Sequence, residues 1–187
     1  MPSPAPSAVA TAPLQFRRAT RADTESIVGR VQSADRGDGA KVGWTTETDL
    51  LDGQRTDVDA VRDLLVRPSS EVVLAESRGE LLACVHLEHH ARDCHLGMVS
   101  VDPARQARGI GRSVMTEAER IARDEWGCLR MTMTVIDVRV ELLSYYARRG
   151  YTPTGEHRPF PYGDHRFGIP RRPDLRFAVL AKELAAV

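Results

Sequence analysis

The sequence has little of several features that mark specialised classes of protein. It has only three cysteines, Cys84, Cys94 and Cys128, an odd number at spacings that no common metal site uses. This argues against a disulfide scaffold and for a reducing compartment. No apolar run approaches the roughly 18 residues that a membrane span requires, and Met1 to Pro13 lack the basic and apolar segments of a secretory signal. We therefore expect a cytoplasmic protein that does not associate with membranes.

The formal net charge is zero, and lysine is rare. The 26 basic and 26 acidic side chains cancel, so a general attraction to nucleic acid is not expected and any phosphate site must be local. Of the 26 basic residues only Lys41 and Lys182 are lysines, which leaves 24 arginines. With arginine this common, a single arginine is weak evidence of function.

The length of 187 residues suits one domain with a substantial core. Residues 1–13 are rich in proline, alanine and serine and are predicted to be a disordered lead-in, followed by a single domain over residues 14–187. Residues 34–53 and 159–173 are predicted to be loops, the first with a poorly defined helix over 47–51.

Hydrophobic periodicity predicts the order of the remaining elements. They are a strand at 14–19, a helix around Ile27, a helix at 58–65, strands at 71–76, 81–90 and 95–101, a helix at 109–126, a strand at 129–136, a helix at 138–149, and strands at 151–157 and 176–180. The three consecutive strands with short turns indicate an antiparallel meander. The whole order indicates an α/β fold with a mixed sheet.

A glycine-containing turn, Gln106 to Gly111, lies between a strand and a helix. Glycine lets the backbone approach a ligand closely, and the free amides and dipole of a helix start suit a pyrophosphate. The dinucleotide fingerprint would need a third glycine where Val114 stands. A P-loop would need glycine in place of Gln106 and lysine in place of Arg112. Both alternatives fail on these residues.

Val99-Ser100-Val101-Asp102-Pro103 followed by Gln106-x-x-Gly109-x-Gly111 resembles the acetyl-CoA motif of the GCN5-related N-acetyltransferase (GNAT) superfamily, including Arg108 before the first glycine. Tyr146 to Tyr151 resembles the late signature of this family, a tyrosine four residues before a glycine and an aromatic residue. The predicted element order is similar to that of the family over residues 14–184. The resemblance implies a GNAT-like mixed, mainly antiparallel central sheet flanked by helices.

The resemblance implies an acetyl-CoA-dependent N-acetyltransferase in which the primary amine of a small molecule attacks the thioester directly. A non-catalytic acetyl-CoA-binding module and a protein or peptide N-acetyltransferase are alternatives, and a homodimer is compatible with the sequence. Arg139 stands where the family often has asparagine, and it could contact a CoA phosphate or pair with Glu141. The cofactor-binding residues that the resemblance implies are Val99, Ser100, Val101, Gln106, Ala107, Arg108, Gly109, Ile110, Gly111, Arg112 and Arg139.

Tyr146 matches the general acid that protonates the departing thiolate in the family. Its place on an apolar stripe with Leu142 and Leu143 also suits a purely structural role. His95 stands eleven residues before Gln106, where some members carry a catalytic glutamate, and could act as the base; a surface or hydrogen-bonded histidine is the simpler interpretation.

Glu88, on the neighbouring strand, is the alternative base. It alternates with His86 and His90 on one strand face, which invites a metal interpretation, but we expect no metal. Acceptor choice is expected in the loops at 34–53 and 159–173, the second of which carries the polar residues Tyr162, Asp164, His165 and Arg166.

Overall fold

The computed structural model describes residues 13–36 and 47–184. The predicted disorder of residues 1–13 therefore concerns a segment that is almost entirely outside the described residues, and the middle of the loop at 34–53 is outside them too. In chain order the described elements are β1 (Gln15–Arg18), η1 (Arg21–Asp23), α1 (Thr24–Asp35), β2 (Leu51–Asp52), α3 (Val58–Val66), β3 (Ser70–Ser77), β4 (Glu80–His90), β5 (Asp93–Val101), η2 (Pro103–Arg105), α4 (Ile110–Arg120), η3 (Ile121–Glu125), β6 (Arg130–Ile136), α5 (Val140–Ala147), β7 (Thr152–Pro159), η4 (His165–Phe167), β8 (Ile169–Pro170) and β9 (Arg176–Glu183).

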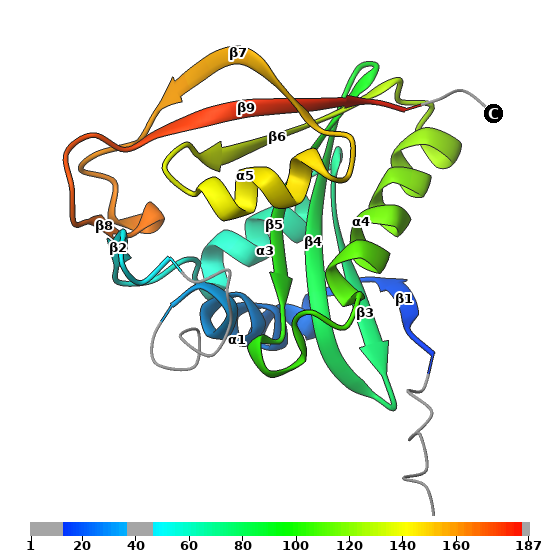
Figure 1. The fold of residues 1–187 in the computed structure, drawn as a ribbon. Coiled ribbons are helices and arrows are strands. Elements are labelled where there is room, and N and C mark those ends of the chain that lie inside the picture. The colour runs from blue at the N-terminus through cyan, green and yellow to red at the C-terminus, as the bar shows by residue number, and fades with distance from the viewer. Residues whose placement is uncertain (1–12, 37–46, 185–187) are drawn as a thin grey trace, which may run out of the picture.

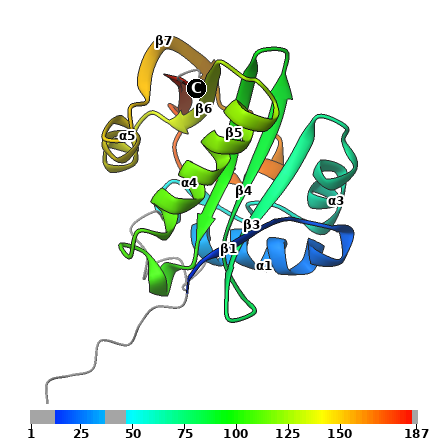
Figure 2. The same ribbon diagram turned by 90° about the vertical axis from the view of Figure 1, so that its right-hand side faces the viewer.

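Seven strands form a central sheet in the order β1-β3-β4-β5-β6-β9-β7. Every neighbouring pair is antiparallel except β5 and β6, which are parallel. Helices α4 and α5 lie on one side of the sheet and α1 and α3 on the other (Figures 1 and 2). The predicted α/β fold with a mixed, mainly antiparallel sheet flanked by helices is confirmed.

Local sequence signals explain where the helices begin and end. Asp57 begins α3 by accepting a hydrogen bond from the Ala60 amide, which satisfies one of the free donors of the first turn. Gly109 precedes α4 with φ +82°, and Gly150 follows α5 with φ +87°, a region that residues with a side chain rarely adopt. These signals are short-range, so the sequence alone predicts the helices well.

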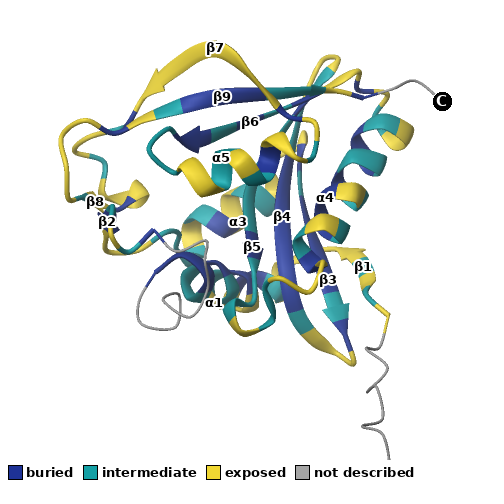
Figure 3. Cartoon of the chain, viewed as in Figure 1, coloured by how far each residue is buried: buried dark blue, intermediate teal, exposed yellow. Residues whose placement is uncertain are grey.

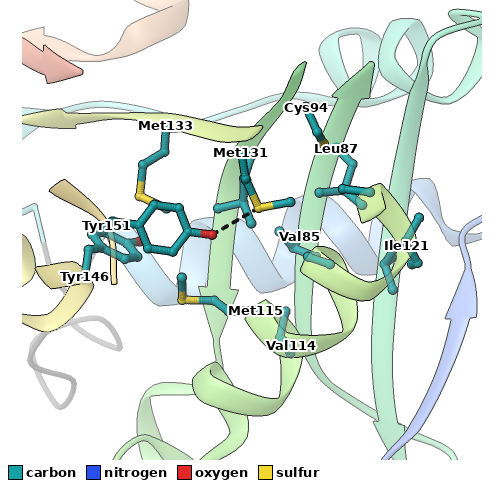
Figure 4. Close-up of a cluster of buried hydrophobic side chains, with 14 of the residues drawn as sticks. Val85, Leu87, Cys94, Val114, Met115, Ile121, Met131, Met133, Tyr146 and Tyr151 are labelled. Carbon is teal, nitrogen blue, oxygen red and sulfur yellow. Dashed lines mark hydrogen bonds between the residues drawn. The ribbon is translucent and has the colours of Figure 1, made fainter. Parts of the chain in front are cut away.

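The hydrophobic core has two main layers, one on each face of the sheet. Val114 and Met115 of α4 and Ile121 of η3 pack with Met131 and Tyr151 on one face (Figure 4). On the other face, α1 and α3 bury Ile27, Val31 and Val61 against β3 and β4. Strand β7 is at the edge of the sheet and is exposed along its length (Figure 3). No helix in the described ranges is both long and apolar enough to span a membrane.

Two loop predictions require correction. Where a helix is predicted over 47–51, a single turn is present, in which the Leu50 and Leu51 amides both donate to the Glu47 carbonyl at 2.9 Å. The loop at 159–173 contains η4 and β8, and β8 pairs with β2 in a separate antiparallel ribbon. Each of these strands has two residues, too few to produce a periodic pattern, and pairing between distant segments gives no local signal.

The feature that positions the site is the divergence of β5 and β6. They pair over only three residues each, Asp93 to His95 with Arg130 to Thr132. Beyond that point the two strands run in different directions (Figure 1). A bulge at Met98, which has φ +50°, also shifts the register between β5 and β4. The central sheet is therefore split on the C-terminal side of His95.

Candidate active site

A cleft of about 620 Å³ lies where β5 and β6 separate. Residues of β5, β6 and α5 line its middle, and Tyr146 is among them. One end is formed by the turn before α4. The other end is formed by Asp35, Glu47, Arg55 and residues near the β2 and β8 ribbon. Figure 1 shows α5 between these two ends, with α4 on the right and the β2 and β8 ribbon on the left.

The turn between η2 and α4 presents backbone to the first end. Gln106, Ala107, Gly109, Gly111 and Arg112 line the cleft there. Ala107 and Gly109 have positive φ values of 63° and 82°, a conformation in which successive amides can converge on an anion. The amides of the first turn of α4 also have no carbonyl acceptor within the helix. The backbone at this end is therefore compatible with the pyrophosphate site that the sequence predicts.

Gly111 leaves room for the side chain of Tyr145 at this end. A Cβ atom at this position would lie 2.8 Å from the Tyr145 hydroxyl, closer than non-bonded contact allows. Tyr145 lines the cleft, and the Arg149 guanidinium carbon lies 3.3 Å from the centroid of its ring. The Tyr145 ring and the Arg149 guanidinium stacked on it thus form one side of the cleft beside the glycine turn.

The β5 edge forms the floor of the cleft. Val99 and Val101 line it, and the backbone here has no β6 partner among the described residues. An unpaired strand edge offers N–H and C=O groups to an extended, amide-containing ligand. Ser100 differs from its neighbours because its side chain is buried, 1% exposed, and does not line the cleft.

Tyr146 lies in the middle of the cleft. Its ring is 7% exposed and makes edge-to-face contacts with Tyr145 and Tyr151, at centroid distances of 5.4 and 6.1 Å. No hydrogen-bond partner of its hydroxyl is found in the described part of the chain. Burial raises the pKa of Tyr146 well above the usual value for a phenol. The side chain therefore combines a core ring with a protonated hydroxyl in the cleft.

The second end of the cleft carries a group of ionised side chains. Glu47 bridges two arginines: Oε2 lies 2.5 Å from Arg36 Nη1 and Oε1 lies 2.8 Å from Arg139 Nη1. Asp35, at the end of α1, has a longer contact, 3.4 Å from Oδ2 to Arg55 Nε. All except Arg36 line the cleft.

The two carboxylates of this group have pKa values shifted in opposite directions. Burial and the negative charge of Glu47 raise the pKa of Asp35 to about 7, although the nearby arginines oppose the shift. Burial also opposes ionisation of Glu47, but the charges of Arg55, Arg139 and Arg36 hold its pKa below the ordinary value. Near neutral pH Glu47 is therefore a fixed anion, while Asp35 can exchange a proton.

An apolar wall completes this end. Phe160, Phe167 and Phe177 line the cleft together with Leu51 and Ile136. The rings of Phe160 and Phe177 lie 5.6 Å apart between centroids, and Phe167 is 42% exposed. The arrangement offers apolar surface beside the ionised residues.

Comparisons with known proteins decide the family. The model of the Acetyltransferase (GNAT) family matches residues 27–151. The chain belongs to the GNAT acetyltransferase family. It is accordingly an N-acetyltransferase, an enzyme of the acyltransferase class. No curated protein matches the chain by sequence.

Solved GNAT structures share the fold of this chain at low sequence identity. The ribosomal-protein-S18-alanine N-acetyltransferase from Escherichia coli has a TM-score of 0.69 and 11% identity, with 94% of this chain and 96% of that chain covered. A spermidine N-acetyltransferase SpeG chimera from Vibrio cholerae and hSSAT has a TM-score of 0.66 and 12% identity, covering 91% and 95% of the two chains. The PaiA N-acetyltransferase from Thermoplasma acidophilum, solved with coenzyme A, has a TM-score of 0.63 and 15% identity, covering 91% and 99%.

In this GNAT fold, the residues predicted to bind the cofactor are only partly brought together. The side chains of Ser100, Arg108 and Ile110 do not line the cleft, whereas Val99, Val101, Gln106, Ala107, Gly109, Gly111 and Arg112 do. Arg139 also lines it, but it pairs with Glu47 instead of Glu141.

The predicted bases lie outside the cleft lining of this GNAT domain. His95 stands where β5 and β6 still pair, with Nδ1 3.4 Å from Thr132 Oγ1, and burial lowers its pKa. Glu88 is paired with Arg67 at 3.2 Å. His86 is buried, with Nε2 2.7 Å from Ser70 Oγ. Within the described ranges no group of three or more His, Cys, Asp or Glu side chains is arranged to hold a metal ion.

Several lining residues were not found from sequence. The polar residues expected in the 159–173 loop, Tyr162, Asp164, His165 and Arg166, do not line the cleft, whereas Phe160 and Phe167 do. Tyr162 instead stabilises its own loop, since its hydroxyl donates a hydrogen bond to the Arg172 carbonyl and accepts one from the Leu175 amide. For Asp35 and Arg55, on separate segments of an arginine-rich chain, the sequence gives no distinguishing signal.

Proposed function

We propose that this protein transfers the acetyl group of acetyl-CoA to the primary amine of a small molecule in the cleft between β5 and β6. One observation carries the proposal: a single cleft contains a glycine turn suited to a pyrophosphate, a strand edge that no described strand pairs with, and a tyrosine hydroxyl without a hydrogen-bond partner in the part of the chain that the structure describes. When bound, acetyl-CoA supplies the thioester that carries the acetyl group.

The residues present fit this co-substrate. The turn from Gln106 to Arg112 would hold the pyrophosphate through backbone amides, and Arg112 adds a positive charge on the cleft. The absence of a side chain at Gly111 keeps the turn compatible with the Tyr145 wall. The β5 edge at Val99 and Val101 would pair with the amide groups of the pantetheine arm and orient the thioester carbonyl.

Tyr146 would donate its hydroxyl hydrogen to the departing sulfur. Its raised pKa keeps the hydroxyl protonated over the physiological range. The same shift makes complete proton transfer to a thiolate less favourable, because a thiol has an ordinary pKa of about 8.5. Tyr146 thus accelerates the reaction chiefly by stabilising charge that develops on sulfur, and its loss slows turnover without abolishing it.

The second end of the cleft supports a small acceptor. It is enclosed by residues from three separate segments: Asp35 at the end of α1, Glu47 and Arg55 around β2, and Phe160 and Phe167 around the last loop. A whole cleft of about 620 Å³, shared with the cofactor, suits a small molecule better than a folded segment of protein.

The three cysteines are unpaired and buried, which supports a reducing location such as the cytoplasm.

Calorimetry with acetyl-CoA tests the cofactor site. Gly111→Leu should weaken binding by at least about tenfold, because the side chain collides with Tyr145 and displaces the turn. Gly29→Leu is the matched control, since Gly29 is exposed on α1 and a Cβ there meets no atom within 4 Å. Unchanged affinity in Gly111→Leu would place the cofactor elsewhere. CoA release with amines, polyamines, amino acids and peptides then identifies the acceptor class.

A further inference from the structure

Asp35 and Arg55 are held less tightly than Glu47 and Arg139, the other charged residues at this end of the cleft. Both oxygens of Glu47 accept short hydrogen bonds from arginines, at 2.5 and 2.8 Å, which are charge-assisted contacts. Arg55 Nε lies 3.4 Å from Asp35 Oδ2 and 3.8 Å from Glu47 Oε2, both too long for such a bond, and it has no hydrogen-bond partner among the described residues. The Arg55 side chain is also 32% exposed. This pair therefore offers an anion and a cation to a ligand in the cleft.

The charge of the whole group limits what can bind there. Three arginines and two carboxylates, with Asp35 ionised, leave one net positive charge. A polycation would meet net repulsion. A zwitterion, by contrast, can place its ammonium group against Asp35 and its carboxylate against Arg55. In an α-amino acid these two groups are separated by one carbon atom, which suits protein charges that already lie side by side.

The apolar wall adds a third contact. Phe160, Phe167 and Phe177 line the same end of the cleft as Asp35 and Arg55. They offer no hydrogen-bonding groups, so a polar side chain placed against them would lose its water without compensation. An apolar side chain would instead gain free energy by burial there.

We infer that the acceptor is an α-amino acid with an apolar side chain, whose ammonium group contacts Asp35, whose carboxylate contacts Arg55, and whose side chain packs against Phe160, Phe167 and Phe177. This inference rests on the proposed function and assigns its substrate class. It also places Asp35, instead of His95 or Glu88, beside the reacting nitrogen.

Asp35 would then take the proton that must leave before the amine can attack. One proton passes from the ammonium nitrogen to the Asp35 carboxylate, and the nitrogen lone pair forms a bond to the acetyl carbon as the C–S bond breaks. The second proton leaves the nitrogen for solvent, the Tyr146 hydroxyl donates its proton to the thiolate sulfur and regains one from solvent, and Asp35 releases its proton to solvent, so that each turnover releases one proton. The charged groups that act on Asp35 are Glu47, Arg55, Arg139 and Arg36.

The test compares two acceptors that differ by one carboxylate. For the wild-type enzyme, kcat/KM with L-phenylalanine should exceed that with phenethylamine by about 10- to 100-fold, as a charge-assisted contact with Arg55 implies. Arg55→Gln should reduce this preference to about one, and Arg55→Lys should restore part of it. Arg62→Gln, at an exposed position on α3, is the matched control and should keep the wild-type preference.

The outcomes separate this inference from the proposed function. Equal or faster reaction of phenethylamine, an unchanged preference in Arg55→Gln, or spermidine as the better acceptor would overturn the amino-acid assignment. Acetyl-CoA binding is measured on the same preparations by calorimetry. If acetyl-CoA binds and L-phenylalanine is not acetylated, only the substrate class is wrong; if acetyl-CoA does not bind, the proposed function itself fails.

Discussion

Replacing Tyr146 by phenylalanine separates its catalytic role from its packing role. The substitution keeps the ring, which is 7% exposed and touches Tyr145 and Tyr151, and removes only the hydroxyl. Because that hydroxyl has no hydrogen-bond partner in the described structure, its removal should change the free energy of unfolding by no more than about 0.5 kcal/mol. If the hydroxyl assists the departing sulfur, kcat should fall by about 10²-fold, which corresponds to about 2.7 kcal/mol of activation free energy.

Tyr151 provides a control with the opposite pattern. Its side chain is 1% exposed, and its hydroxyl lies 3.0 Å from Glu119 Oε1 and 3.0 Å from Met131 Sδ (Figure 4). Tyr151→Phe deletes a buried hydrogen bond to a charged group, which should cost about 1.5–3 kcal/mol of unfolding free energy. Tyr151 does not line the cleft, so kcat should stay within about twofold of wild type.

The assay needs three measurements on each variant: the unfolding free energy from urea denaturation, the dissociation constant of acetyl-CoA, and kcat on an acceptor that the amine panel identifies. Tyr146→Phe should lower kcat while leaving the other two nearly unchanged. Undiminished kcat would remove Tyr146 from the mechanism and leave water as the proton donor. A fall in stability with unchanged kcat would show that the tyrosine serves the core alone.

Two further predictions concern the charged end of the cleft. Glu47→Ala should lower the unfolding free energy by about 3–5 kcal/mol, because it leaves the buried Arg36 without its partner. The exposed ion pair of Glu156 and Arg158 is the control, and Glu156→Ala should cost less than about 1 kcal/mol. A cost for Glu47→Ala below that of the control would contradict the ion-pair argument. The pKa of Asp35 is raised to about 7 from an ordinary value near 4. The free energy of unfolding of the wild type should therefore fall as the pH rises through this window. Asp35→Asn should accordingly cost less unfolding free energy at about pH 8 than at about pH 5. Urea denaturation of both proteins at the two pH values checks this, and an equal cost at both would refute the raised pKa.

The fold was predictable to the extent that its signals are local. The order of the main helices and strands follows from periodicity and from turn residues such as Gly109 and Gly150, whose positive φ values mark helix ends. The glycine-containing turn from Gln106 to Gly111 is also local, because its glycines and the start of α4 are adjacent in the chain. The β2 and β8 ribbon gave no such signal, since two-residue strands have no period and their partners come from distant parts of the sequence.

The sequence by itself determined the family resemblance, the central sheet with its flanking helices, and the position of Tyr146 in a recognisable signature. Only the tertiary structure decided the composition of the other end of the cleft. Arg139 lies 92 positions from its partner Glu47, and the phenylalanine wall comes from yet another part of the chain. The physical reason is that helices and tight turns form through contacts between near neighbours. A pocket for an acceptor instead forms where distant segments meet, and which charges remain available there depends on which ion pairs the fold has already made.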